Sequence, residues 1–211
     1  AVARAVSRSG IPRGEIFITT KLWNDDQRSG KVMEAFEASL KKLNTDYVDL
    51  YLIHWPVADK FVRSWQVLEE IYQSGRARAI GVSNFKKHHL ETLKKSTEII
   101  PAVNQIELHP YLIQQEDVDY CLQSGIRPEA WSPFAAGKTG LFDEPVLVEL
   151  ARRYRWDYQR GIVTIPKSSH KKRLAENIDI FDFELTSEEI GRINALNKNE
   201  RIGADPDHFT F

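Results

Sequence analysis

The sequence has a single cysteine, Cys121, and no apolar run that approaches the length of a membrane span. One cysteine cannot form a disulfide within the chain, so we expect a reducing, cytoplasmic compartment. Cys121 lies in a segment, 118–122, that is typical of a helix with a buried face, which favours a place in the core over a catalytic thiol. A membrane span needs about 20 consecutive apolar residues, and residues 1–6 are too short and too charged for a signal sequence.

An excess of either charge is also missing. Lysine and arginine number 29 and aspartate and glutamate 30, which leaves a net charge of −1. A basic patch for nucleic acid or for an anionic membrane is therefore not expected. The chain is 42% hydrophobic and 28% charged, which is the composition of an ordinary globular protein with a substantial core.

Short apolar segments alternate with helical patterns along the whole chain, which predicts parallel βα units. The predicted strands are 16–21, 48–54, 79–82, 102–107, 127–131 and 162–166. The predicted helices are 1–9, 30–43, 62–74, 86–95, 115–124, 145–154, 170–177 and 187–196, the last beginning in the capping-box pattern Thr186-Ser-Glu-Glu189. Residues 197–211 show no periodicity and are expected to form a loop.

Two α/β architectures have this alternation: an open doubly wound sheet and a (β/α)8 TIM barrel. No G-x-G-x-x-G pattern follows any predicted strand, and polar residues end all of the strands rather than only those at the point where the strand order of an open sheet reverses. Both observations favour the barrel, whose active site lies at the carboxyl ends of its strands. A closed barrel typically needs about 250 residues, so we expect a single barrel domain over 1–211 that lacks its first two βα units.

Six local patterns together resemble the signatures of the aldo-keto reductase family, in that family's order. The closing pattern, 201–207, is similar to the bacterial branch that holds the 2,5-diketo-D-gluconic acid and glyoxal reductases. The six are Thr19-Thr-Lys-Leu-Trp23, Asp49-Leu-Tyr-Leu-Ile-His-Trp-Pro56, Ile80-Gly-Val-Ser-Asn-Phe85, Asn104-Gln-Ile-Glu-Leu-His-Pro110, Trp131-Ser-Pro133, and Ile165-Pro-Lys-Ser168 with Arg173-x-x-Glu-Asn177.

Lys21 and His54 are the candidate catalytic residues. The resemblance implies that Lys21 lowers the pKa of a tyrosine that donates a proton, and that His54 orients the substrate carbonyl. Without the resemblance, the residue types favour a strand-end lysine that extends to water at Lys21, and a structural histidine at His54, as His109 is expected to be. No residue has metal-ligand spacing to His54, so a metal is not expected. The resemblance also implies that Trp23, His54 and Trp55 contact the substrate.

The resemblance implies NADPH as the cofactor. Trp131 is expected to stack on the nicotinamide, while Ser83, Asn84 and Gln105 recognise its carboxamide; Ser83 and Asn84 are alternatively caps of the next helix. Lys167, Ser168 and Arg173 are expected to enclose the 2′-phosphate, although that basic cluster is alternatively a solvated helix face. The remaining cofactor residues that the resemblance implies are Ser132, Pro133, Phe134, Ser169, Glu176 and Asn177.

The sequence departs from the family pattern in two places. The family's proton donor is a tyrosine five residues after an aspartate, but residues 1–20 contain neither residue type. Asp46 and Tyr51 have that spacing, yet Tyr51 is an odd number of positions from His54 and should face the other side of its strand. The segment 152–156 is also about ten residues shorter than in the family. We expect that segments of a longer protein are absent, and hence an intact mass above 24.3 kDa. The alternative is a truncated relative that cannot close its barrel, which an intact mass equal to 24.3 kDa would indicate.

The predicted function is NADPH-dependent reduction of an aldehyde or ketone, such as a keto sugar acid or a methylglyoxal-like carbonyl, to an alcohol. The proton would come from a tyrosine outside this sequence. The alternative is a regulatory or structural protein that binds NADP(H) on the same barrel without turnover. The expected partner is a small-molecule carbonyl substrate, and the expected oligomeric state is a monomer.

Overall fold

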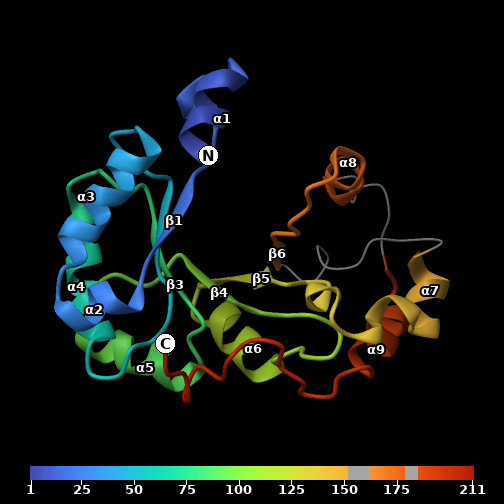
Figure 1. Ribbon diagram of the computed structural model, residues 1–211. Helices are drawn as coiled ribbons and strands as arrows, with labels where there is room; N and C mark the ends of the chain where they lie inside the picture. Colours follow the sequence, from blue (N-terminus) through green and yellow to red (C-terminus); the bar gives the residue numbers. More distant parts are fainter. Residues whose placement is uncertain (152–161, 179–184) are drawn as a thin grey trace. The chain divides into compact units, whose positions relative to one another are not determined.

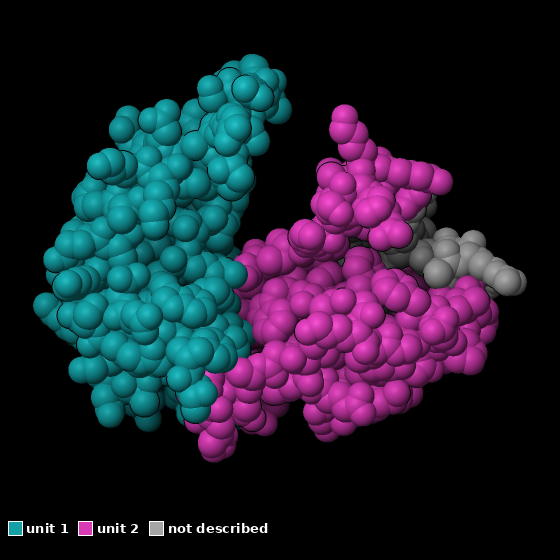
Figure 2. Space-filling model, in the orientation of Figure 1, with its two compact units in different colours: residues 1–104, 210–211 teal, residues 105–209 magenta. Residues whose placement is uncertain are grey.

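The computed structural model describes residues 1–151, 162–178 and 185–211 (Figure 1). The chain divides into two compact units, which Figure 2 shows in different colours. Unit 1 comprises residues 1–104 with 210–211, and unit 2 comprises residues 105–209. The expectation of a single domain over 1–211 remains a prediction.

Unit 1 alternates strands and helices as the sequence predicted. Its strands are β1 (Thr19–Leu22), β2 (Leu50–Ile53), β3 (Ile80–Ser83) and the first residues of β4 (Val103–Glu107). Its helices are α1 (Val2–Ser9), the 3-10 turn η1 (Arg13–Glu15), α2 (Asn24–Ser29), α3 (Val32–Leu43), α4 (Phe61–Gln73) and α5 (Lys87–Ser96).

The strands of unit 1 are hydrogen-bonded in chain order, β1-β2-β3. Both pairs are parallel: Lys21 lies opposite Leu52 in the first pair, and Ile53 opposite Val82 in the second. Sequential parallel strands need a helical crossover between them, and α3 and α4 provide it. The neighbour order agrees with a barrel-type arrangement and not with a doubly wound one, in which the strand order reverses.

The core of unit 1 lies between these strands and the helices. α3 packs on β1, and α4 packs on β2 and β3. Apolar residues repeat at helical spacing in both helices, which predicts one buried stripe on each: Val32, Phe36, Leu40 and Leu43 on α3, and Val62, Trp65, Leu68 and Ile71 on α4. Of these, Phe36, Trp65 and Leu68 are completely buried. Burying a side chain of this size contributes roughly 1.5–3 kcal/mol, so the stripes explain why the helices lie on the strands.

A buried carboxylate joins the beginnings of these strands. Asp49 accepts a hydrogen bond from the Ile18 backbone N–H at 2.9 Å. Its two oxygens also pair with the guanidinium groups of Arg13 at 2.9 Å and Arg78 at 3.0 Å. Both guanidinium groups lie over the ring of Tyr47, at 4.1 and 4.3 Å from its centroid. The charge of Asp49 is thus compensated inside the protein, as a buried ion requires.

Unit 2 holds the rest of β4 and the later elements. β5 (Arg127–Trp131) pairs with β6 (Val163–Thr164) in parallel. Thr186 and Glu189 form the predicted capping box, with N–H···O distances of 3.2 and 2.8 Å. The helical elements of unit 2 are α6 (Gln115–Gln123), η2 (Ala135–Gly137), η3 (Gly140–Asp143), α7 (Pro145–Ala151), α8 (Lys171–Ile178) and α9 (Ser187–Asn194).

Three local predictions were wrong or incomplete. Residues 16–18 were expected in a buried strand, but β1 begins at Thr19 and Phe17 is 71% exposed. The sixth strand is shortened to two residues, and Val163 and Ile165 are 45% and 43% exposed. Helix α2 was not predicted, because its six residues carry no apolar stripe.

The remaining local predictions either are confirmed or concern residues that the structure does not describe. Cys121 is completely buried in α6, as expected of a core cysteine. Helix 145–154 is described as far as Ala151, and the segment 152–156 lies outside the described residues. None of the helices in the described ranges is long and apolar enough to cross a membrane.

Gly81 provides a test of the packing of β3 in unit 1. A Cβ at this position would lie 2.6 Å from the Val103 carbonyl oxygen and 2.7 Å from Leu52 Cδ2. We expect Gly81→Ala to lower the free energy of unfolding by about 1–3 kcal/mol, because overpacking displaces neighbours. Gly14→Ala is the control, since a Cβ added at that position would have nothing within 4 Å. Urea denaturation measures both, and equal stability of the two variants would contradict this account of the packing.

Candidate active site

The register of β1, β2 and β3 brings polar residues to one end of unit 1. Lys21 lies opposite Leu52, and the His54 N–H donates to the Leu22 carbonyl at 3.1 Å just beyond the paired residues. Because paired residues share a face and alternate residues return to it, Lys21 and His54 point to the same side. Ile53 lies opposite Val82, so Ser83 is the next neighbour of His54.

His54 is half-buried, and its environment keeps it neutral. Burial, followed by the nearby positive charge of Lys21, lowers the pKa of His54 from 6.5 to about 4. At neutral pH the ring therefore carries a single proton and can donate one hydrogen bond without being an acid. The Lys21 contribution also places the two candidate catalytic groups within electrostatic reach of each other.

Aromatic rings surround His54 within unit 1. Trp23 meets its imidazole edge-on, with ring centroids 4.9 Å apart, and Trp55 lies 6.4 Å away. Phe211 stacks on Trp23 at 6.0 Å and meets Trp55 edge-on at 5.3 Å. Trp55 is buried, whereas Trp23 is 41% exposed and offers an open apolar surface. The predicted substrate contacts Trp23, His54 and Trp55 therefore lie together.

Polar groups of α2 fix the position of Phe211. Asn24 Nδ2 donates to the Phe211 carbonyl at 2.9 Å, and Arg28 donates to the same oxygen at 2.8 Å. Sequence reasoning missed this arrangement, since Asn24 and Arg28 lie in the helix that was not predicted. The aromatic residues near the end of the sequence were its one visible signal.

Ser83 and Asn84 are buried where β3 ends. The Asn84 amide donates to the His54 carbonyl at 3.0 Å and to Ser83 Oγ at 3.2 Å. Asn84 has a φ of 63°, a left-handed conformation that asparagine tolerates better than most residues. Neither residue is the N-cap of α5, which is Lys86, so the alternative that they cap this helix does not apply.

Tyr51 is turned away from His54, as strand alternation predicted. Its ring packs against Phe36 of α3, with centroids 4.9 Å apart, and the residue is completely buried. Burial, with a contribution from Asp26, raises the pKa of its phenol. The Tyr51 hydroxyl has no hydrogen-bond partner among the described residues, and its high pKa makes it a poor proton donor.

In unit 2, several of the predicted nicotinamide residues lie on β4 and β5. Gln105 is buried in β4 and donates its amide to Glu129 of β5. Trp131 is the last residue of β5 and is half-buried, so part of its indole remains open for stacking. Ser132 follows with a φ of 51° and turns the chain sharply. Pro133 is buried, and Phe134 is exposed and 5.8 Å from the ring of Phe142.

The predicted phosphate residues lie before α8 and in its first turn, in unit 2. Lys167 and Ser169 are exposed before α8, and Ser168 Oγ accepts the His170 N–H at 3.1 Å. Arg173 is exposed in the first turn of α8. Lys172 pairs with Glu176 at 3.9 Å, and Glu176 and Asn177 are half-buried one turn further on. Flexible cations that extend into solvent fit a doubly charged phosphate.

The structure also reveals a buried carboxylate that sequence reasoning did not select. Glu107 ends β4, is completely buried and lies 3.0 Å from the equally buried His109. Glu107 also accepts the backbone N–H groups of Ile202 and Gly203. His109 is thus a structural histidine, as predicted. The only signal for Glu107 was its place at the end of a strand.

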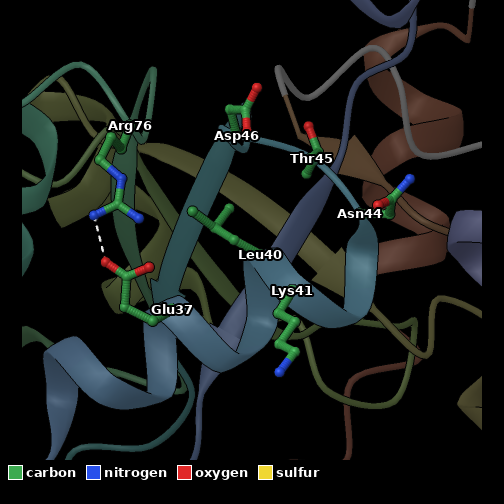
Figure 3. A pocket seen from close by; sticks show the side chains of 7 residues that line it. All are labelled: Glu37, Leu40, Lys41, Asn44, Thr45, Asp46 and Arg76. Atoms are coloured by element: carbon green, nitrogen blue, oxygen red, sulfur yellow. Dashed lines mark hydrogen bonds and ion pairs between the residues drawn. The ribbon is translucent and has the colours of Figure 1, made fainter.

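A pocket of about 580 Å³ lies elsewhere on unit 1. Figure 3 shows its lining, which includes the Glu37–Arg76 ion pair, Lys41 of α3, and residues 44–46 of the following loop. The loop precedes β2, whereas His54 follows β2, so the pocket lies at the other end of that strand. In barrels this end is associated with stability rather than catalysis.

Comparison with known proteins relates this chain to one enzyme family. The model of the family described as "Aldo/keto reductase family" matches residues 1–146 and 143–198. Glyoxal reductase of Bacillus subtilis is 51% identical over 219 residues, which cover 100% of this chain and 79% of that protein. Methylglyoxal reductase DkgA of Escherichia coli K12 is 43% identical, with 99% of this chain and 79% of that protein covered.

Among solved structures, an aldo-keto reductase of Bombyx mori in complex with NADP superposes with a TM-score of 0.88 at 40% identity. The match covers 98% of this chain and 76% of that one. The fold is therefore that of a (β/α)8 barrel, of which this sequence spans a shortened form. On the family match and on these identities, the chain belongs to the aldo-keto reductase family of oxidoreductases.

Proposed function

We propose that this protein reduces small aldehydes and ketones to alcohols with NADPH, and that glyoxal-type carbonyls and keto sugar acids are its substrates. The observation that carries the proposal is the placement of a neutral His54 beside Lys21 on one face of the strands. The names of the Bacillus subtilis and Escherichia coli relatives support the substrate class. The NADP complex of the Bombyx mori relative supports the cofactor.

Each candidate residue has a chemical role in this proposal. NADPH supplies the hydride when it is bound. His54 donates a hydrogen bond to the carbonyl oxygen and stabilises the negative charge that develops there. Lys21 adds positive charge beside the site, which lowers the pKa of a nearby phenol. Trp23 and Trp55 give the substrate an apolar surface.

The proton donor in this proposal is a tyrosine at the family position before β1. Residues 1–20 of the sequence contain no tyrosine. Tyr51 does not replace it, since its ring lies against α3. In the proposal Gln105, Ser83 and Asn84 bind the carboxamide, and Trp131 carries the nicotinamide with Ser132, Pro133 and Phe134 beside it. Lys167, Ser168, Ser169 and Arg173 bind the 2′-phosphate, and Glu176 and Asn177 lie toward the adenine.

Turnover tests the proposal directly. Oxidation of NADPH by methylglyoxal, followed by its ultraviolet absorbance, should be lowered about a hundredfold or more by His54→Leu, because one oxyanion-stabilising donor is lost. Lys21→Met should also lower kcat while leaving NADPH affinity nearly unchanged. His88→Leu, at an exposed histidine on α5, is the matched control.

Four outcomes separate the alternatives, measured on a protein that carries the family tyrosine. Loss of kcat with retained NADPH binding in the variants supports the reductase. Binding of NADPH without turnover by the unmodified protein identifies the regulatory or structural alternative. Absence of NADPH binding excludes both, and full activity of His54→Leu contradicts the role of His54.

The protonation state of His54 gives an independent prediction. Its ring protons should titrate by NMR with a midpoint near pH 4, because burial and Lys21 lower its pKa to about 4. In the unfolded state His54 has the ordinary pKa of 6.5, so as pH falls the unfolded state takes up this proton before the folded state does. The contribution of His54 to the free energy of unfolding is therefore lost between pH 6.5 and 4. Lys21→Met should raise the midpoint, though not to 6.5, since burial remains. His54→Gln assigns the signal, and a midpoint near 6.5 in the unmodified protein would contradict the lowering of the His54 pKa by burial and Lys21.

Arg173 should determine cofactor preference. Removal of its bidentate bond to the 2′-phosphate in Arg173→Ala should weaken NADPH binding about tenfold to a hundredfold and NADH binding much less. Lys172→Ala is the control, since it removes one charge from the same helix. Fluorescence titration measures both cofactors, and equal losses for the two would refute the assignment.

A further inference from the structure

Residues 195–209, the part of the tail after α9 that belongs to unit 2, are held by hydrogen bonds although they contain no helix or strand (red in Figure 1). The Tyr111 carbonyl accepts the backbone N–H groups of Lys198 and Glu200, each at 3.1 Å. Asn197 Oδ1 accepts the Ile113 N–H at 3.2 Å. These bonds lie between the tail and the loop that follows β4. A segment whose sequence predicts a plain loop is therefore held along its backbone.

Glu107 is the buried anchor of this tail. Its Oε1 accepts the Ile202 N–H at 2.7 Å, and its Oε2 accepts the Gly203 N–H at 3.1 Å. Burial alone would raise the pKa of Glu107, but the hydrogen bonds from His109 and the two backbone groups outweigh it and hold the pKa below its usual value. The anchor is thus an ionised carboxylate, whose hydrogen bonds are about twice as strong as neutral ones.

Gly203 is the point at which the tail meets Trp131. A Cβ at Gly203 would lie 2.5 Å from Trp131 Cη2 and 3.2 Å from Cζ2, and 3.1 Å from Glu107 Oε2. Glycine is required here by space, because any side chain would displace the rigid edge of the indole. The backbone of the tail consequently forms a wall against one edge of Trp131.

We propose that Glu107 and Gly203 are positioning residues for Trp131, and that the tail holds the indole in the plane on which the nicotinamide ring stacks. This inference rests on the proposed function, in which Trp131 is the stacking surface. Without such a wall, a half-buried indole at the end of a strand has more than one rotamer open to it. Fixing it before the cofactor binds reduces the ordering cost of binding.

The nicotinamide half of the cofactor should respond to Gly203, and the adenosine half should not. Gly203→Ala is expected to weaken NADPH binding about tenfold, since overpacking displaces the indole. Binding of adenosine 2′,5′-bisphosphate, which lacks the nicotinamide, should stay unchanged. Gly191→Ala on α9 is the matched control, because nothing lies within 4 Å of its added Cβ. Calorimetric titration measures both ligands, and thermal melting confirms that each variant folds.

Repeating the Gly203→Ala substitution in a Trp131→Phe variant isolates the contact between Gly203 and the indole. Phenylalanine lacks the Cη2 and Cζ2 atoms of tryptophan, so Gly203→Ala should cost little NADPH affinity when combined with Trp131→Phe. Glu107→Gln keeps the shape of the anchor but loses an acceptor oxygen, and should weaken NADPH binding selectively as Gly203→Ala does.

The outcomes distinguish this inference from the function on which it rests. Selective loss of NADPH affinity that disappears in the Trp131→Phe background supports it. The inference is overturned if Gly203→Ala weakens the binding of NADPH and of the bisphosphate equally, or if it weakens NADPH binding as much in the Trp131→Phe protein as in the unmodified one. In both cases the proposed reductase activity is not affected. If Trp131→Ala binds NADPH as tightly as the unmodified protein, the stacking role of Trp131 fails and the inference fails with it.

Discussion

The parallel register of β1, β2 and β3 is the constraint on which the placement of Lys21 and His54 depends. In this register Lys21 lies opposite Leu52, and Ile53 lies opposite Val82. The pairing therefore determines which residues of the three strands are neighbours at the strand ends. A shift of one residue would send each side chain to the opposite face. Tyr51 illustrates the consequence. It directly precedes Leu52, the partner of Lys21, so its side chain points to the opposite face of the strand and packs against Phe36 of α3.

Burial and neighbouring groups leave two ionisable residues of this protein in opposite charge states: His54 is neutral and Glu107 is ionised. His54 is kept neutral because burial and the Lys21 cation both oppose its protonation. Glu107 is more deeply buried, yet stays ionised because three N–H donors surround its carboxylate. The first arrangement suits a group that donates a hydrogen bond during a reaction. The second suits a fixed anchor, and Asp49 between two arginines in unit 1 is another example.

Prediction from sequence succeeded where the signal was local and periodic. The stripes of α3 and α4, the capping box of α9 and the buried Cys121 follow from spacings within one element. It failed at residues 16–18, where an apolar run was mistaken for a buried strand and Phe17 is exposed. Apolar composition alone does not show whether a neighbouring element covers a residue.

The sequence by itself determined the alternation of strands and helices, the polar strand ends, and the resemblance that selects Lys21 and His54. Only the tertiary structure decided that Phe211 lies on Trp23 and Trp55, and that Gly203 lies against Trp131. The physical reason is the separation along the sequence between the residues that interact. Helix and strand periodicity is encoded by residues a few positions apart, whereas these contacts join segments far apart in the sequence and arise only when the chain path brings them together.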